Sequence, residues 1–180
     1  MIYFSSLLPK KLPRLYHELK DSGLEHQLLT KTKDIWARDY MAIKVGDRYI
    51  QFHYSPSYLK GYNHTRTNPL DCLPGGIELK QSTLIVDGGN VVYNNSFVVM
   101  TTAVFKENNN VAPKEVRREL EMLFYPKKLI FIPTEEGDMF GHADGMLRFI
   151  DNNLVVINDY YNLGYTQTFI NQLYGTLRKE

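Results

Sequence analysis

Three segments of the chain carry hydrophobic residues at the three- and four-residue spacing of an amphipathic helix. Residues 12–23 end in a glycine that is typical of a helix terminus, and residues 113–124 begin with a proline, which is favoured in a first helical turn. Residues 166–179 repeat the pattern. We therefore predict a helix in each segment. The residues expected to face a core in the second and third are Val116, Leu120, Leu123, Phe124, Phe169, Ile170, Leu173 and Leu177.

Runs of β-branched and aromatic residues between these helices predict strands. The strands and hairpins are expected at residues 26–30, 41–54, 84–105, 127–133 and 145–158. The first hairpin would turn at Gly46 and Asp47, a dipeptide that favours a tight turn. Residues 55–80 are rich in Pro, Gly, Asn and Tyr and are expected to form a long surface loop.

The order of these elements predicts an internal repeat. It runs strand–strand–helix–strand and then strand–strand–helix, so the second copy lacks the strand that would close it. We expect an α/β (α+β) fold in one domain over residues 1–180, built from repeated units of which the last is incomplete. Exposed strand edges in such a fold predict self-association into a homo-oligomer.

The composition and charge of the chain argue against several classes of function. Hydrophobic residues make up 43% and charged residues 23% of the 180 positions, which are ordinary globular values. A net charge of +1 predicts no general attraction to nucleic acid or to anionic lipid. The N-terminal charges follow the short apolar run, unlike a signal peptide, and no window suits a membrane span. A single cysteine, Cys72, excludes an intrachain disulfide, and we expect a cytoplasmic protein.

An aspartate precedes each predicted hairpin at a similar place. These residues are Asp39, Asp87 and Asp144; Trp36 precedes the first, and His142 lies beside the third. Residues at equivalent points of repeats around an axis are expected to converge, and converging carboxylates need a cation between them. A planar guanidinium suits two carboxylates and also stacks on an indole. A metal is less favoured, because one histidine with scattered aspartates is a weak ligand set.

Each of these features also has an ordinary structural interpretation. Trp36 alone is more often a core residue, and Arg38 with Asp39 alone is more often a structural ion pair. Gly88 and Gly89 alone suggest a tight turn, and His142 alone suggests a hydrogen-bonded loop histidine. Their occurrence at equivalent points of a repeat is what favours a functional site.

Three segments, in this order, resemble one enzyme family: DIWARDYMAI (34–43), LIVDGGNVV (84–92) and GHADGMLRF (141–149). The chain resembles the agmatine deiminase and Porphyromonas-type peptidylarginine deiminase family of guanidine-modifying enzymes. The resemblance implies a pentein-type α/β-propeller of ββαβ units and a small guanidino substrate. It implies that Asp39 and Asp144 hold the guanidinium, that His142 is the acid/base and that Trp36 lines the pocket. Neither a metal nor an organic cofactor is implied.

Two positions depart from the family pattern. Asp87, implied to bind substrate, stands where many relatives have a glutamate, and its side chain is one methylene shorter. In the family, a cysteine near the C-terminus attacks the guanidinium carbon through its thiolate, whereas no cysteine follows Asp144 here. Cys72 lies on the wrong side of His142 in sequence order and is not expected to be catalytic.

Three hypotheses follow for the function. The chain is a shortened guanidine deiminase that is inactive alone, or it is a non-catalytic relative that binds guanidino ligands or a partner protein. A weaker third hypothesis is a metal-dependent hydrolase that uses His142, Asp144 and Asp87. The choice between agmatine, free arginine and peptidyl arginine is expected to depend on residues 55–80 and on C-terminal residues that relatives have.

Overall fold

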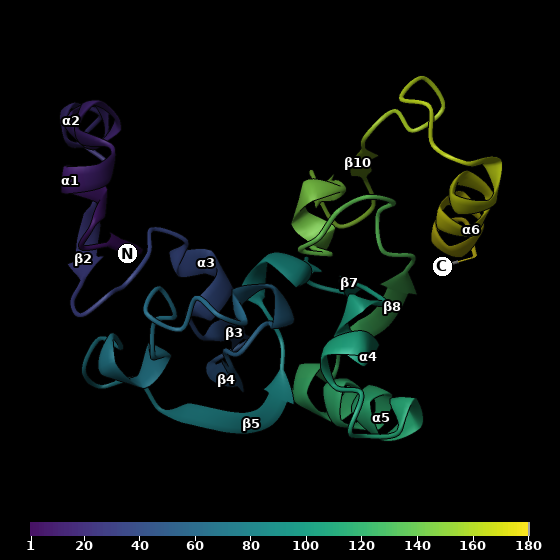
Figure 1. The fold of residues 1–180 in the computed structure, drawn as a ribbon, viewed down its shortest axis with the longest axis horizontal. Coiled ribbons are helices and arrows are strands. Elements are labelled where there is room, and N and C mark those ends of the chain that lie inside the picture. The colour runs from purple at the N-terminus through teal and green to yellow at the C-terminus, as the bar shows by residue number, and fades with distance from the viewer. Residues whose placement is uncertain (180) are drawn as a thin grey trace. The chain divides into compact units, whose positions relative to one another are not determined.

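The computed structural model describes residues 1–179, which form a mixed α/β fold (Figure 1). Contacts between residues divide the chain into two compact units, Met1–Thr83 and Leu84–Glu180. Each unit is described by itself below. Among the described residues, no helix is both long and apolar enough to cross a membrane.

The first unit begins with a strand–helix–strand element. Strands β1 (Ile2–Ser5) and β2 (His26–Leu29) pair in parallel, and helices α1 (Leu8–Lys11) and α2 (Pro13–Asp21) connect them. The predictions of α2 and β2 are confirmed. Strand β1 was not predicted, because its four residues show neither a long apolar run nor a flanking turn signal.

The rest of the first unit is a three-stranded sheet of order β3-β4-β5. Strands β3 (Ile43–Val45) and β4 (Arg48–His53) form the predicted hairpin, with Val45 opposite Arg48 across the Gly46–Asp47 turn. Gly46 has a φ of +61°, a left-handed conformation that glycine adopts without strain. The loop that follows contains the one-turn helices η1 (Ser57–Leu59) and η2 (Pro69–Asp71), and strand β5 (Leu79–Ile85) completes the sheet.

The second unit reproduces the predicted strand–strand–helix–strand order. Strand β6 (Val92–Tyr93) pairs antiparallel with β7 (Phe97–Thr101), which pairs in parallel with β8 (Lys128–Ile132). Helices α4 (Ala103–Glu107) and α5 (Pro113–Phe124) form the crossover between β7 and β8. The antiparallel strands β9 (Leu147–Phe149) and β10 (Val155–Ile157) and the helix α6 (Gln167–Leu177) follow, as the second, partial copy.

The core of this unit lies where α6 and the residues just before β9 pack on β7 and β8. Its buried members include Val99, Ile132, Met146 and Leu173. Seven of the predicted core residues are buried, whereas Leu177 is only partly buried. They are Val116, Leu120, Leu123, Phe124, Phe169, Ile170 and Leu173. This packing fixes the ends of β7 and β8, next to which the candidate site residues lie.

Two details of the predicted hairpin at 84–105 were wrong. Leu84 and Ile85 end strand β5 and do not begin the hairpin, because residues 88–90 turn into the short helix η3 and interrupt the extended chain. Strand β7 ends at Thr101, and Ala103–Glu107 is helical. Thr101 Oγ1 accepts the Ala103 N–H, which helps to turn the chain from strand to helix.

Candidate functional site

The three aspartates singled out in the sequence occupy similar local positions. Asp39 lies in the one-turn helix α3 (Ala37–Tyr40), Asp87 is the N-cap of η3 (Gly88–Asn90), and Asp144 lies in η4 (Ala143–Gly145). Each short helix comes directly before a strand of a hairpin. The local equivalence expected from the repeat is therefore present.

His142 and Asp87 form a pair in the second unit. His142 Nε2 lies 3.1 Å from Asp87 Oδ2, although 55 positions separate the two residues in sequence. Both side chains are largely buried, with exposed fractions of 14% for His142 and 7% for Asp87. A carboxylate at this distance fixes the orientation of the imidazole ring and stabilises its protonated form. The pair is therefore suited to proton transfer.

Asn90 connects the two turns that carry this pair. Its buried Oδ1 accepts the backbone N–H of Thr101 at 2.8 Å and that of Ala143 at 3.2 Å. Thr101 in turn donates its hydroxyl to the Gly141 carbonyl at 2.5 Å. These bonds attach η3 and η4 to the buried end of β7, so the position of His142 depends on the core of the unit.

Asp138 organises the chain just before His142. Its carboxylate accepts the backbone N–H groups of Phe140, Gly141 and His142 at 2.8–3.3 Å. Gly141 in this segment has a φ of +70° and lies against Ala103 and Thr134. The segment before the histidine is thus fixed by hydrogen bonds on one side and by close packing on the other.

A cavity of about 540 Å³ opens beside His142 and Asp144. Its lining is acidic: Glu135, Glu136 and Asp138 contribute carboxylates in addition to Asp144, and no lysine or arginine lines it among the described residues. Phe140 adds an aromatic wall whose ring centroid is 6.0 Å from that of His142. Such a cavity favours a cation with a planar or apolar part.

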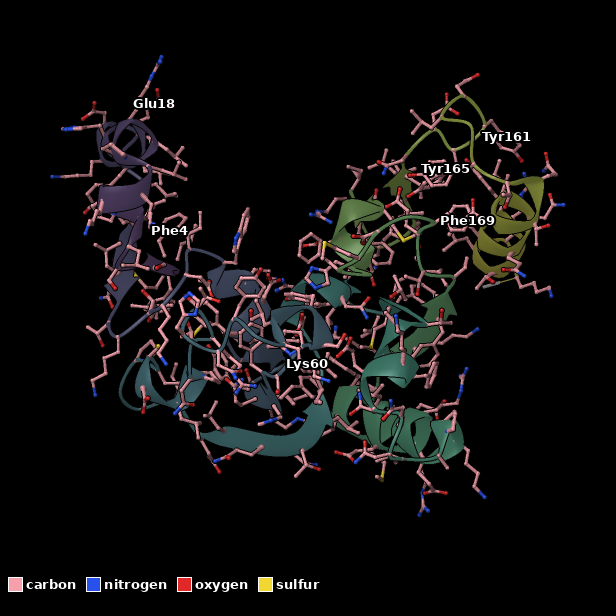
Figure 2. All side chains as sticks on the ribbon, viewed as in Figure 1. Phe4, Glu18, Lys60, Tyr161, Tyr165 and Phe169 are labelled. Carbon is pink, nitrogen blue, oxygen red and sulfur yellow. The ribbon has the colours of Figure 1, made fainter. Side chains whose placement is uncertain are left out.

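Two of these acids also fix the start of α6. The Tyr165 hydroxyl donates to Glu135, and Glu136 accepts both the hydroxyl and the backbone N–H of Thr166. The bond to Glu135, with smaller effects of burial and nearby carboxylates, raises the pKa of Tyr165 to about 12. The Tyr165 ring also packs against Phe169 of α6, with ring centroids 5.3 Å apart (Figure 2). The bonds from Thr166 lower the pKa of the Glu136 carboxyl, which favours its ionised form.

Asp144 has a cationic neighbour outside the cavity lining. Arg148 Nη2 lies 3.7 Å from Asp144 Oδ2, and Arg148 Nη1 donates to the Asp144 and Leu147 carbonyls. The pair is partly exposed, with side-chain exposed fractions of 56% and 30%, so solvent screens it. A ligand guanidinium can therefore compete for the Asp144 carboxylate.

Trp36 and Asp39 belong to the first unit. Trp36 is 66% exposed, which contradicts the core interpretation, and its backbone N–H donates to Asp34 Oδ1 at 2.8 Å. Asp39 is half-buried in α3. The convergence of Trp36 and Asp39 with the His142 cavity stays a prediction.

Cys72 lies in an apolar environment that is unfavourable for a thiolate. It is 4% exposed and packs with Leu29, Tyr40 and Tyr54, and its thiol donates to the Asn68 carbonyl at 3.4 Å. Burial is the main cause that raises the pKa of this thiol above its usual value. The thiol therefore stays protonated at neutral pH, unlike an activated nucleophile.

Sequence reasoning missed the acids that give the cavity its charge. The run Glu135-Glu136-Gly137-Asp138 stands two residues before the GHADG motif, so this signal was visible in the sequence. Tyr165 and Asn90 gave no such signal, because their roles depend on contacts with distant segments. Within residues 1–179, no three His, Cys, Asp or Glu side chains come together as a metal site, so His142, Asp144 and Asp87 do not form the ligand trio of the third hypothesis.

Comparisons with known proteins relate the fold to guanidine-modifying enzymes. Campylobacter jejuni agmatine deiminase matches with a TM-score of 0.67 at 18% identity, over 99% of this chain and 68% of that one. A structure of the same enzyme with substrate bound gives a TM-score of 0.68. Agmatine deiminase of Enterococcus faecalis matches at 0.65 and 14% identity, over 99% of this chain and 53% of that one.

The similarity extends to a more distant enzyme. DDAH from Pseudomonas aeruginosa matches with a TM-score of 0.52 at 10% identity, over 91% of this chain and 62% of that one. A search of the curated proteins gives no match. The model of the Porphyromonas-type peptidyl-arginine deiminase family matches residues 13–174. Since that match takes in all three sequence motifs and nearly the whole chain, the protein belongs to the Porphyromonas-type peptidyl-arginine deiminase family.

Proposed function

We propose that this chain binds the guanidinium group of agmatine or of an arginine side chain as the substrate of a deimination reaction. The observation that carries the proposal is the His142–Asp87 pair at an acidic cavity that Asp144 also lines. Asp144 accepts guanidinium N–H groups, and Asp39 is proposed to supply a second carboxylate. Trp36 then stacks on the planar cation. The substrate-bound agmatine deiminase supports a small guanidino ligand for this fold.

In the proposed chemistry, His142 moves protons and Asp87 holds its ring. A cysteine thiolate, which this chain is not proposed to supply, would attack the guanidinium carbon and form a covalent intermediate while His142 donates a proton to the nitrogen that leaves as ammonia. Water, from which His142 removes a proton, would then attack the same carbon and displace the thiolate, which gives the ureido product. The Asp87 carboxylate, next to Nε2, stabilises the protonated imidazole between these steps. Asp87 is also proposed to lie within reach of the substrate, as the resemblance implies, although its shorter side chain makes the contact with His142 its main role.

We propose that residues 1–180 do not complete the reaction by themselves. The only cysteine of the chain has a buried thiol with a raised pKa, and the chain spans 68% and 53% of the two agmatine deiminases compared. The two units are proposed to belong to one pentein-type propeller domain. A non-catalytic, guanidino-binding relative is the alternative, and the environment of Cys72 supports it equally.

Among the possible substrates, the cavity favours agmatine over free arginine. A second positive charge on the ligand is attracted by the acidic lining, whereas a carboxylate is repelled. One charge pair at about 4 Å contributes roughly 1 kcal/mol in water. Two lining carboxylates at this distance would together repel the carboxylate of arginine by about 2 kcal/mol, so replacing it by hydrogen should improve binding roughly thirtyfold.

Titration calorimetry with agmatine tests this proposal. Asp144→Asn and Asp39→Asn should each abolish measurable binding, whereas Glu121→Gln, which removes a negative charge on α5 away from the cavity, should not. Ammonia release should be undetectable. Turnover that is abolished by Cys72→Ser would overturn the assignment of Cys72, and unchanged binding in both aspartate variants would overturn the site. A clean monomer in sedimentation would contradict the predicted self-association.

A further inference from the structure

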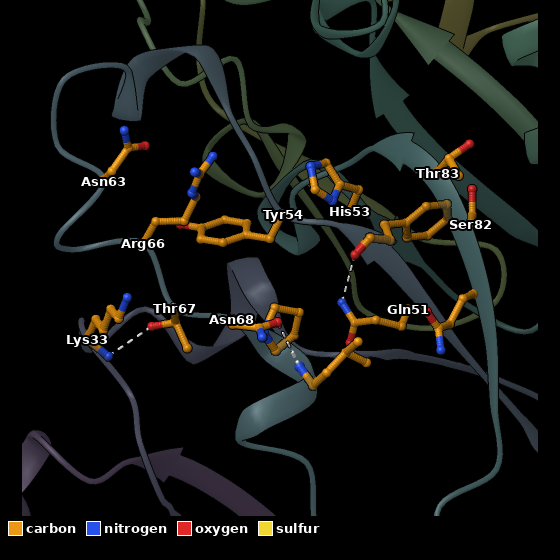
Figure 3. A pocket seen from close by; sticks show the side chains of 14 residues that line it. Lys33, Gln51, His53, Tyr54, Asn63, Arg66, Thr67, Asn68, Ser82 and Thr83 are labelled. Atoms are coloured by element: carbon orange, nitrogen blue, oxygen red, sulfur yellow. Dashed lines mark hydrogen bonds between the residues drawn. The ribbon is translucent and has the colours of Figure 1, made fainter.

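The first unit contains a separate cavity of about 710 Å³ that shares no residue with the site described above. The end of β4, the middle of β5 and the loop between them line it. Figure 3 shows Arg66 and Asn63 on one side of this cavity, His53, Ser82 and Thr83 on the other, and Lys33 and Thr67 below. Its volume is in the range of small-molecule sites.

The charged residues that line this cavity are basic, whereas those that line the cavity beside His142 are acidic. Lys33 and Arg66 line it together with His53, and no aspartate or glutamate does so among the described residues. Neither Lys33 nor Arg66 forms an ion pair with another described residue. Two permanent positive charges facing a concave surface without carboxylates favour an anion.

One hydrogen bond joins the two segments that carry the cations. The Lys33 backbone N–H donates to Thr67 Oγ1 at 2.9 Å, and Thr67 is fully buried next to Arg66 in sequence (Figure 3). Arg66 Nη1 also donates to Ser55 Oγ at 2.5 Å, which restrains the guanidinium. An anion bound here would therefore meet a guanidinium that is already partly ordered, which lowers the entropic cost of binding.

Gln51 supplies a second, independent indication of a ligand. It lines the cavity, is only 5% exposed, and donates through Nε2 to the Tyr40 and Phe52 carbonyls at 3.0 and 2.8 Å. These two bonds fix which end of the amide is the donor. Its Oε1 has no hydrogen-bond partner among the described residues. A buried acceptor without a partner is unfavourable, and a ligand donor would satisfy it once the Gln51 side chain turns toward the cavity, because Oε1 has less than 1 Å² of accessible surface.

We propose that this cavity binds a small organic anion that also carries a hydrogen-bond donor, such as a hydroxy acid or a hydroxylated phosphate ester. Lys33 and Arg66 take the carboxylate or phosphoryl group, and Gln51 Oε1 accepts the hydroxyl. The ligand is distinct from the guanidinium cation, which the acidic cavity takes. Binding here does not depend on the proposed deiminase function.

Titration calorimetry at constant ionic strength, with L-lactate and glycerol 3-phosphate as probes, tests the proposal. Saturable binding of at least one of these two anions is expected. The anion that binds more tightly identifies carboxylate or phosphoryl as the preferred group. Propionate and glycerol are the controls, because propionate lacks the hydroxyl of lactate and glycerol lacks a charge. Propionate should bind at least tenfold more weakly than L-lactate, and glycerol should bind at least tenfold more weakly than glycerol 3-phosphate.

Matched variants distinguish anion binding in this cavity from the effect of removing any positive charge. Lys33→Gln and Arg66→Gln should each weaken the anion at least tenfold, whereas Lys80→Gln and Arg14→Gln, which remove equal charges outside the cavity lining, should not. Asp144→Asn should leave anion binding unchanged while it abolishes agmatine binding. Absence of saturable binding by both anions at millimolar concentrations, or equal losses in the matched variants, would overturn the proposal. Equal affinity for lactate and propionate would overturn the role of Gln51.

Discussion

Replacing Gly141 with alanine should destabilise the second unit strongly. The residue has a φ of +70°, and a left-handed conformation costs a residue with a Cβ about 1–2 kcal/mol. The new Cβ would lie 2.6 Å from Ala103 Cβ and 3.2 Å from Thr134 Cγ2. Since carbon atoms normally pack at about 3.5–4.0 Å, the backbone must move, which costs about 1–3 kcal/mol. The sum predicts a loss of about 2–5 kcal/mol in the free energy of unfolding.

Gly137 provides the control for this substitution, because it lies in the same segment with a φ of +82°, and a Cβ added there would meet no atom within 4 Å. Gly137→Ala should therefore lose only the conformational part, about 1–2 kcal/mol. Urea unfolding followed by far-ultraviolet circular dichroism measures both. Because His142 follows Gly141 directly, agmatine affinity should also fall in Gly141→Ala. Equal losses of stability in the two variants would refute the steric argument.

Three further predictions concern single side chains. Asn90→Ala should lower the free energy of unfolding by about 2–6 kcal/mol in urea, since two buried backbone N–H groups lose their acceptor; a loss below about 1 kcal/mol would contradict this. The hydrogen bond to Glu135 raises the pKa of Tyr165 from about 10 to about 12. The stability that this bond contributes is therefore present below pH 10 and is lost as the pH rises through 12. An ultraviolet titration should lose one late-titrating group in Tyr165→Phe, and an unchanged titration would contradict the bond to Glu135. Iodoacetamide should modify Cys72 slowly in the native chain and rapidly in urea, and equal rates would contradict its burial.

The parts of the fold that the sequence predicted well are those with a strong local period. The apolar face of α5 follows from Val116, Leu120 and Leu123, which are spaced for a helix and are all buried. Strand β5 was assigned to the wrong partner because the residues Leu84 and Ile85 favour extended structure equally well beside β4 or at the start of a hairpin. The choice of partner depends on contacts outside the segment.

The sequence singled out the residues of the candidate site but not the contacts between them. The repeat predicted similar local positions for Asp87 and Asp144, which the structure shows at η3 and η4. It gave no side-chain direction, so the hydrogen bond between Asp87 and His142 was not predicted. The cavity with Gln51 and Arg66 could not be predicted either. Its walls come from segments far apart in sequence, and an unpaired buried oxygen is visible only when every neighbour is placed.

The way in which Asn90 holds the His142 turn has a consequence for how this protein can be redesigned. The His142–Asp87 pair depends on bonds from η3 and β7, whereas Glu135 and Glu136 supply charge from the segment after β8. Because the same two carboxylates hold Tyr165 and Thr166 at the start of α6, replacing either one changes the charge of the cavity and weakens the attachment of α6 together. A redesign for a ligand of another charge must therefore replace the hydrogen bonds at the start of α6 as well as the charge, while Asn90 is left unchanged.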